Sequence, residues 1–420
     1  MSSIPVDVLG LGAEGLPGLG PAAKARLHAA TFLAGGRRHL ELAGGRAGER
    51  FAIADNVDGL VERLRARGPD ERCVVLASGD PLFYGIGRAL SIGLGPDQIR
   101  VEPAVSSMQL AFARAGLAWQ DATIVSVHGR PLAPTLLPLL GRPRIGLFTR
   151  DGGSPAAVAS FFLDRGLDDY SAWIGERLGT AAERVTRLPL ANLPGSRFDD
   201  LNFLILERYH ERAGVFDWVE RSRLAVPDVL FARPEAGPIL LTHADVRAIT
   251  ITRFREVLGG PIWDVGAGLG GVAVDLARAF PAVEVVGFER SETQLDHLRE
   301  NRRRFAAYNL RVVAGEAPGC LVDEDRPAGV FLGGTGGKLD EILDLVIDRL
   351  REGGVLVANF VGIENLARFS ERVRAEGWPL DVAQVQVSQG RPLAGLTTLV
   401  PLRQVWVVAS TRPLPGRDGA

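Results

Sequence analysis

The sequence predicts an α/β protein made of two modules. Both halves of the 420-residue chain alternate strand-like apolar runs with helical patterns, and each half has a glycine-rich turn directly after such a run. Between the halves, a charged and aromatic stretch leads into several prolines. Because domains usually hold about 100–200 residues, we expect a first module at 1–208, a linker at 209–236 and a second module at 237–412.

The first half begins with the alternation of a mainly parallel sheet that has helices on its faces. After about residue 170, strand-like runs follow one another without a long helix, which predicts an antiparallel second sheet in the same module. The expected strands are Val6–Leu9, Cys73–Ala77, Ile99–Glu102, Thr123–Val127 and Ile145–Phe148, then Tyr170–Ile174, Arg184–Pro189 and Leu201–Leu206; the expected helices are Leu60–Arg67, Ser107–Ala115 and Pro155–Asp164.

The second half starts the alternation again, in the order expected of a Rossmann-like methyltransferase. A helical pattern at His243–Leu258, with Asp245 able to support its first turn, comes first. Val382–Val387 and Val405–Ala409 are expected to close the sheet as an antiparallel pair. The other expected strands are Ile262–Val265, Val283–Phe288, Leu310–Val313, Val330–Leu332 and Val355–Phe360, and the other expected helices are Gly270–Phe280, Glu292–Ala306, Leu339–Leu350 and Ile363–Glu376.

Composition and charge argue against several classes of protein. The net charge of -2 gives no general attraction to nucleic acid or to an anionic membrane. No apolar run reaches the roughly 18 residues of a membrane span, and the N-terminus lacks the features of a secretory signal. Cys73 and Cys320 fit neither a disulfide framework nor metal-ligand spacing, so no metal is expected. We expect a cytoplasmic protein without nucleic-acid or membrane partners.

The most informative stretch is Asp264–Gly270, a glycine-rich turn that joins a strand to a helix and can approach a ligand closely. Its glycine spacing also fits a dinucleotide site. The acid that begins it favours S-adenosylmethionine, because in methyltransferases this acid orients the methionine end of the cofactor. Two further acids end the next two strands, where they would hold the ribose hydroxyls and contact the adenine. The candidate cofactor residues here are Asp264, Gly266, Gly268, Gly270, Glu289, Glu316 and Ala317.

A second glycine-rich loop, Phe331–Lys338, follows the fourth strand of this half. Its glycines leave room for a bulky planar substrate, and their N–H groups can meet carboxylates; a flexible loop is the alternative. Thr242 and Arg247 lie at the start of a helix before the cofactor strand, where they could contact cofactor and substrate. An arginine there is also typical of a solvated helix face. The candidate catalytic residues are Thr242, Arg247, Gly334, Thr335 and Gly336.

The first half has a weak glycine turn after its first strand and a stronger turn at Ser78–Pro81. There glycine admits a ligand, the aspartate accepts hydrogen bonds and the proline fixes the turn. Two serines then begin a helix and offer hydroxyls and free N–H groups to a cofactor; a plain N-cap is the alternative. A histidine at the next strand end would, taken alone, be structural. The candidate cofactor residues are Gly10, Gly12, Gly79, Asp80, Phe83, Ser106, Ser107 and His128.

These motifs carry a resemblance to known families. The first half resembles the tetrapyrrole methylases through Leu9–Gly12, Ser78–Gly85 and Ser126–Arg130. The second half resembles the decarboxylating cobalt-precorrin methyltransferases. The fused order, over about residues 4–410, resembles the precorrin-6Y C(5,15)-methyltransferase (decarboxylating) family of cobalamin synthesis. In the second half, the matching stretches are Leu241–Arg247, Asp264–Gly270, Gly315–Pro318, Phe331–Gly337, Val385–Ser388 and Gly390–Leu393.

The resemblance implies a tetrapyrrole methylase fold of two α/β subdomains followed by a Rossmann-like class I methyltransferase. It implies C-methylation of a precorrin at carbons 5 and 15 with loss of the ring C acetate carboxylate, from precorrin-6B to precorrin-8. One S-adenosylmethionine per module and a homo-oligomer are expected. The alternatives are a methyltransferase that acts on RNA or protein, a tetrapyrrole carrier and a dehydrogenase.

Some positions depart from the usual family pattern. Ala13 stands where proline is usual, and Asp245 where glutamate is usual. Leu269 and Gly271 replace small hydroxyl residues, and Leu396–Leu399, which includes Thr398, lacks an arginine. These departures concern substrate contacts and leave the cofactor pattern in place.

Overall fold

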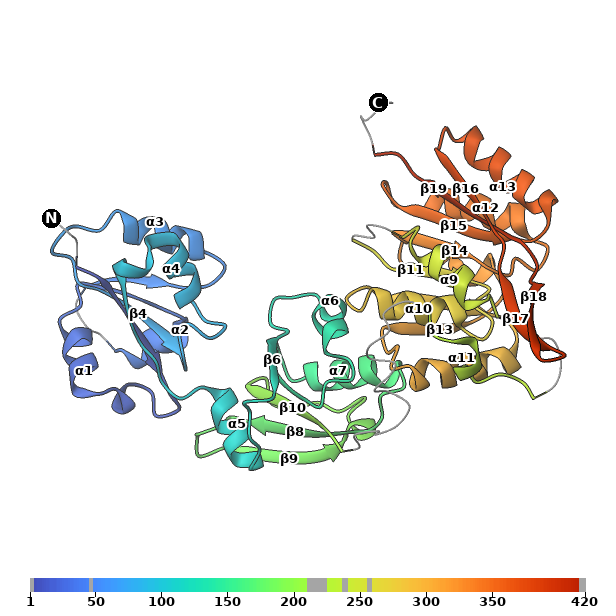
Figure 1. Ribbon diagram of the computed structural model, residues 1–420. Helices are drawn as coiled ribbons and strands as arrows, with labels where there is room; N and C mark the ends of the chain where they lie inside the picture. The colour runs from blue at the N-terminus through green and yellow to red at the C-terminus, as the bar shows by residue number, and fades with distance from the viewer. Residues whose placement is uncertain (1–3, 45–47, 210–224, 236–240, 255–258, 415–420) are drawn as a thin grey trace. The chain divides into compact units, whose positions relative to one another are not determined.

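The computed structural model describes residues 4–44, 48–209, 225–235, 241–254 and 259–414. The chain forms two compact units (Figure 1): the first comprises residues 1–131, 142–159 and 169–209, and the second comprises 132–141, 160–168 and 210–420. Most of the expected linker 209–236 lies outside the described residues. The helix expected at His243–Leu258 is shorter than expected, because it already ends at Ile251 and residues 252–254 are not helical. The expected α/β fold class is confirmed.

A parallel five-stranded sheet begins the first unit, with strand order β3-β2-β4-β1-β5. Strand β1 pairs with β4 up to Leu11 and Ser78, so the two glycine turns that follow these strands leave the sheet at the same edge. The sequence patterns do not predict the four-residue strands β2 and β3 or the helices beside them. The elements are β1 (Val6–Leu11), α1 (Pro21–His28), β2 (Phe32–Gly35), α2 (Arg37–Leu42), β3 (Glu49–Ala52), α3 (Val57–Arg65), β4 (Cys73–Ser78), α4 (Gly87–Leu94) and β5 (Ile99–Glu102).

The second sheet of this unit has the order β6-β7-β10-β8-β9 and is mixed: β6 and β7 are parallel, and the other pairs are antiparallel. The assignment of Thr123–Val127 and Ile145–Phe148 to the first sheet is therefore wrong. The Phe148 ring packs on that of Phe203 at 4.9 Å and binds β7 to β10. The elements are α5 (Ser107–Ala115), β6 (Thr123–Ser126), β7 (Arg144–Phe148), β8 (Tyr170–Glu176), β9 (Arg184–Pro189) and β10 (Asn202–Arg208), together with α7 (Ser154–Leu163), whose residues 160–163 belong to the second unit.

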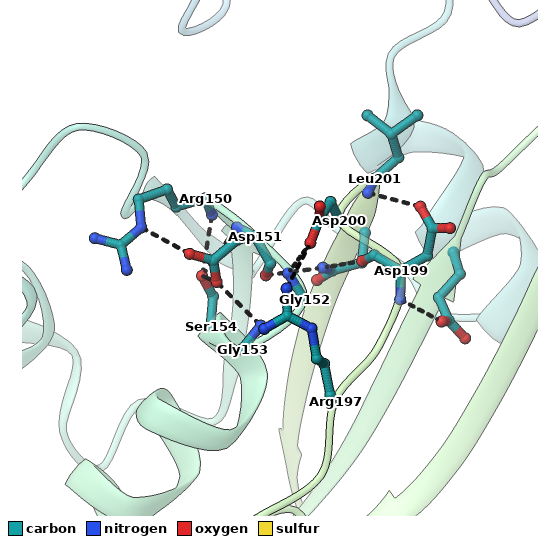
Figure 2. Close-up of polar contacts among 11 residues, drawn as sticks. Arg150, Asp151, Gly152, Gly153, Ser154, Arg197, Asp199, Asp200 and Leu201 are labelled. Atoms are coloured by element: carbon teal, nitrogen blue, oxygen red, sulfur yellow. Dashed lines mark hydrogen bonds and ion pairs between the residues drawn. The ribbon is translucent and has the colours of Figure 1, made fainter.

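A polar network fixes the loop between β7 and α7 (Figure 2). Asp151 accepts hydrogen bonds from the Gly153 N–H at 3.0 Å and from the Ser154 hydroxyl at 3.1 Å. The Gly152 N–H donates to Asp200 at 2.9 Å, which joins this loop to the one before β10. The network satisfies backbone donors at the start of a helix, and its acids are thereby occupied by structural contacts.

The second unit contains a seven-stranded sheet of order β13-β12-β11-β14-β15-β19-β16. Strands β11 to β15 are parallel, and β19 is antiparallel to β15 and β16, as expected for the closing pair. The elements are α6 (Leu132–Leu136), α9 (Ala244–Ile251), β11 (Ile262–Val265), α10 (Gly271–Ala279), β12 (Val285–Glu289), α11 (Glu292–Arg304), β13 (Leu310–Ala314), β14 (Gly329–Leu332), α12 (Leu339–Arg349), β15 (Val355–Phe360), α13 (Ile363–Ala375), β16 (Leu380–Val385) and β19 (Val405–Thr411).

The chain order of the strands reverses between β11 and β14. Ligands of open α/β sheets bind beyond the carboxyl ends of the strands at such a reversal. Buried side chains cover both faces of this sheet, and β11 itself is buried along its whole length. The loops after β11 and β14 are thus held on a rigid base.

A hairpin that the sequence patterns do not predict lies between β16 and β19. Its strands, β17 (Ser388–Leu393) and β18 (Leu396–Pro401), pair only with each other. Leu393, Leu396 and Leu399 on it are 61%, 76% and 69% exposed. Within the described residues, no helix has the length and apolar character needed to span a membrane, and no cluster of three or more side chains could hold a metal ion.

Candidate active site

A cavity of about 650 Å³ opens in the second unit at the point where the strand order reverses. The loops after β11, β12, β13 and β14 line it, together with the start of α9, the end of β15 and the connection from β18 to β19. The sequence-predicted residues Thr242, Asp264, Gly266, Gly268, Glu289, Glu316, Ala317, Gly334, Thr335 and Gly336 all lie in its wall.

Two glycine turns meet at the base of this cavity. A Cβ atom on Gly266 would lie 2.2 Å from the carbonyl oxygen of Gly334, and its φ of +74° also disfavours a side chain. Gly270 has a φ of +86°, and a Cβ there would lie 2.3 Å from Leu298, so its role is the packing of α10. Because neither Gly266 nor Gly334 carries a side chain, the two turns pack closely together and no side chain from these positions enters the cavity.

Asp264 is the most unusual side chain in the wall. It is 1% exposed, and both of its carboxylate oxygens lack a hydrogen-bond partner among the described residues. Burial raises the pKa of Asp264 to about 7, while the backbone N–H of Ala273 lowers it and the negative charge of Glu289 raises it. A buried, partnerless carboxylate is costly for a folded chain, so it fits the ammonium group of a ligand's methionine end.

Glu289 is also positioned by the turn after β11. Its Oε2 accepts the Gly268 N–H at 2.8 Å, and its Oε1 accepts the N–H groups of Arg290 and Ser291, each at 2.9 Å. A carboxylate has about four acceptor sites, so Oε2 keeps one for an additional donor. The remaining acceptor position on Oε2 of Glu289 can accept a hydrogen bond from one ribose hydroxyl.

Glu316 joins three of the loops that line the cavity. Arg290, after β12, donates to it at 2.8 Å, and Lys338, in the loop after β14, lies 3.1 Å from its second oxygen. Hydrogen bonds from Lys338 and Arg290 hold the pKa of Glu316 below its usual range. The expected contact of Glu316 with an adenine is thus in competition with two cations.

Arg247 differs from the expectation that it contacts cofactor or substrate. Its side chain is fully buried and does not line the cavity. Its guanidinium donates to Asp275 at 2.6 Å and to Asp228 at 2.7 Å, and also to the carbonyls of Thr242 and Val226. Four of its five N–H groups are occupied in this way. The contacts are those of a positioning residue that fixes Thr242 at the cavity wall.

In the first unit, the glycine turns after β1 and β4 come together. The Gly79 N–H donates to Leu11 at 2.8 Å, and a Cβ on Gly10 would lie 2.1 Å from the Gly79 carbonyl oxygen. Gly79 has a φ of +58°, and its own Cβ would lie 3.0 Å from the Cα of Ser106. Gly12 has more room, since a Cβ there would meet Ala104 only at 3.8 Å.

The other candidates in this unit make mostly structural contacts. Ser106 forms a capping box with Gln109 at the start of α5, which agrees with the alternative of a plain N-cap; Ser107 is the first residue of that helix. Asp80 accepts the Leu82 N–H at 2.9 Å, and Phe83 packs against Phe148. His128 is exposed, and its backbone N–H donates to the Ser126 hydroxyl oxygen at 3.3 Å.

Tyr84 is a residue of this site that the sequence analysis did not select. Its φ is +57°, a conformation that costs a non-glycine residue free energy. Its hydroxyl donates to the Ile124 carbonyl at 2.8 Å and so joins the loop after β4 to the second sheet. The sequence gives no signal for this contact, because the acceptor is a backbone atom 40 positions away.

Comparison with known proteins gives matches along most of the chain. Residues 6–194 match the Tetrapyrrole (Corrin/Porphyrin) Methylases, and residues 237–412 match the Precorrin methyltransferase domain. A precorrin-6Y C(5,15)-methyltransferase [decarboxylating] of Sinorhizobium sp is 33% identical over 402 residues, 95% of this chain and 94% of its own.

Two shorter relatives match less than half of the chain each. A cobalt-precorrin-7 C(5)-methyltransferase of Salmonella typhimurium is 36% identical over 186 residues, 44% of this chain and 91% of its own. A cobalt-precorrin-6B C(15)-methyltransferase (decarboxylating) of Salmonella typhi is 35% identical over 183 residues, 43% of this chain and 93% of its own.

Proposed function

The chain belongs to the precorrin-6Y C(5,15)-methyltransferase (decarboxylating) family, and from this premise we propose how its two modules divide the reaction. It is a methyltransferase that transfers methyl groups from S-adenosylmethionine to a precorrin and decarboxylates it. We assign methylation of carbon 15 and decarboxylation to the module at 237–412, and methylation of carbon 5 to the module at 1–208. Proteins with these separate activities exist among the relatives.

One observation carries the assignment of a cofactor site to the second module. Asp264 holds two partnerless carboxylate oxygens in the wall of a cavity at the carboxyl ends of parallel strands. Its neighbours fit the rest of the same cofactor: Glu289 keeps one acceptor for a ribose hydroxyl, and the Gly266 turn admits close approach. When bound there, S-adenosylmethionine supplies an electrophilic methyl group.

The residues of the second module then act mainly by positioning. The meso carbons of a reduced precorrin are already nucleophilic, so the site needs to hold one of them in line with the methyl group, and positioning of this kind contributes several kcal/mol, up to about 7–11 kcal/mol in well-oriented systems. The Gly334–Gly336 loop leaves space for the macrocycle beside Thr242. In the decarboxylation, the bond from the acetate methylene to its carboxylate breaks, carbon dioxide leaves, and the electron pair enters the conjugated macrocycle. The former methylene carbon then takes up a proton and becomes a methyl group, and methylation of carbon 15 releases the proton that this carbon carried. No amine catalyst is required.

The first module binds a second S-adenosylmethionine, which gives one per module. Support comes from the junction of Gly10, Gly79 and Ser106 at one edge of the parallel sheet, where backbone groups can approach a ligand. This module methylates carbon 5 of the product that the second module makes.

We also propose that the enzyme works in the cytoplasm as a homo-oligomer. Cys73 and Cys320 are both free thiols, as expected in a reducing compartment. Exposed apolar surface is a feature of protein interfaces, and the directly paired Leu393 and Leu396 are 61% and 76% exposed on one face of the hairpin. Light scattering of the purified chain should give a mass of at least twice the 45.0 kDa of one chain, and a mass of 45.0 kDa would contradict the homo-oligomer.

The test is mass spectrometry of the tetrapyrrole after incubation of the pure chain with precorrin-6B and S-adenosylmethionine. Two methyl gains and the loss of one carbon dioxide are expected. Asp264→Ala should abolish methylation of carbon 15 and decarboxylation, yet still methylate carbon 5 when supplied with precorrin-7. An unchanged macrocycle with wild-type protein, or an unchanged product with Asp264→Ala, would contradict the assignment.

A further inference from the structure

Acidic side chains dominate the part of the cavity over β11, β12 and β13. Asp264, Glu289 and Glu316 all line it there. The guanidinium of Arg290, the next residue after Glu289, is paired with Glu316 at 2.8 Å. The carboxylates of these side chains attract ammonium groups, accept hydrogen bonds from hydroxyl groups and repel a carboxylate of a ligand. A substrate that carries several carboxylates therefore needs a positive partner on another part of the wall.

Arg403 is a cation of that kind. It lines the same cavity from the connection between β18 and β19, on the other side of the point where the strand order reverses. In the described part of the chain it has no ion pair and no side-chain hydrogen bond. Its neighbours in the wall include Val361, Leu402 and Val405. An unpaired guanidinium among aliphatic side chains matches an anionic group carried on an apolar ring.

The backbone holds Arg403 in a fixed place. The Leu402 N–H donates to Val387 at 2.8 Å, and the Leu402 carbonyl accepts from the Gln386 side chain at 2.7 Å. On the other side, Gln404 bonds to Gln384 at 2.8 Å and β19 begins one residue later. The side chain is thus exposed on a hydrogen-bonded frame, so a ligand would order only the arginine itself.

We propose that Arg403 binds a peripheral carboxylate of the macrocycle in the second site. This inference rests on the proposed function, since it names a contact to the substrate of that site. The contact is a charge-assisted hydrogen bond, two-pronged if both oxygens face the guanidinium. It binds substrate and takes no part in bond making.

The test compares Arg403→Gln with wild type in the full chain, with carbon dioxide release from precorrin-6B as the assay. The KM for the macrocycle should rise about 10- to 100-fold, as loss of a charge-assisted hydrogen bond implies. The kcat and the KM for S-adenosylmethionine should change less than about twofold, because Arg403 binds the macrocycle equally in the ground state and in the transition state. Arg403→Lys keeps the charge but loses the planar fork, so it should recover only part of the loss.

Arg374→Gln is the matched control. Arg374 is an exposed arginine on α13 that does not line the cavity, so its removal changes the net charge equally and should leave every constant unchanged. Carbon 5 methylation of precorrin-7 by Arg403→Gln should also equal that of wild type. A macrocycle KM within twofold of wild type in Arg403→Gln, or an equal rise in Arg374→Gln, overturns the proposal. If wild type itself releases no carbon dioxide, the proposed function fails, which is a different result.

Discussion

The carboxyl of Asp264 should make the stability of the cofactor-free enzyme depend on pH. The group is 1% exposed, and burial raises its pKa to about 7, against 3.8 for an ordinary aspartate. At a pH between these two pKa values, Asp264 is protonated in the folded state and ionised in the unfolded state. The free energy of unfolding therefore falls as the pH rises through this window, and it levels off above pH 7.

The size of the effect follows from the same two values. Between pH 5 and pH 8, the free energy of unfolding should fall by roughly 2.5 kcal/mol, since each unit of pKa difference corresponds to about 1.4 kcal/mol. For a unit of this size, that corresponds to a fall of about 5–10 °C in unfolding temperature. Asp264→Asn removes the titrating group, so the variant should lack this part of the pH dependence.

Cofactor affinity should change with pH in the opposite direction. The ionised carboxyl is the form that attracts an ammonium group, so the apparent affinity for S-adenosylmethionine in the second module should weaken about 20-fold from pH 7.5 to pH 5.5. The assay is the KM for S-adenosylmethionine during carbon dioxide release, together with calorimetric unfolding of wild type and Asp264→Asn at each pH. Because other groups also titrate, the relevant quantity is the difference between the two proteins.

Two results would refute this reasoning. One is a difference in unfolding free energy between wild type and Asp264→Asn that is the same at pH 5 and pH 8. The other is a KM for S-adenosylmethionine that stays constant across pH 5.5–7.5. The first would mean that the charge of Asp264 in the folded state does not change between pH 5 and pH 8. The second would mean either the same or that Asp264 does not contact the cofactor.

Three other substitutions test the remaining contacts. Arg247→Met should destabilise the second unit by about 3–5 kcal/mol in denaturant unfolding, because it leaves buried Asp275 without its partner; Arg247→Met combined with Asp275→Leu should recover much of this, and additive losses would argue against the pair. Gly266→Ala should abolish carbon dioxide release but spare carbon 5 methylation, since the new Cβ would meet Gly334. Gly79→Ala should do the reverse, as its φ of +58° disfavours alanine; mass spectrometry with each precorrin separates the two outcomes.

The periodic patterns predict the elements that are long or bounded by clear signals. Ser107–Ala115 and Val355–Phe360 have the bounds expected from the sequence. The four-residue strands β2 and β3 escape prediction because so short a run carries no period. The placement of Thr123–Val127 in the first sheet is wrong because strand pairing is set by contacts distant in sequence, here between Phe148 and Phe203.

Some residues of the candidate site could likewise be predicted from the sequence, and others could not. Residues at the ends of successive parallel strands, such as Asp264 and Glu289, could be placed together from the sequence, since topology brings those ends to one edge. The role of Arg247 could not, because its partners Asp228 and Asp275 lie 19 and 28 positions away and no local pattern joins them. The hairpin that places Arg403 in the wall is likewise visible only in the fold.

The two proposed cofactor sites differ in how their side chains are already bonded within the chain. In the first unit, the side chains of Ser106 and Asp80 already bond to the chain's own backbone, so recognition there must depend largely on main-chain groups around Gly10 and Gly79. In the second unit, the buried side-chain oxygens of Asp264 have no hydrogen bond of normal geometry within the described residues, which destabilises the unliganded fold and favours the bound state. Binding should therefore raise the unfolding temperature of the second unit more than that of the first at pH 7.5, and this excess should vanish in Asp264→Asn.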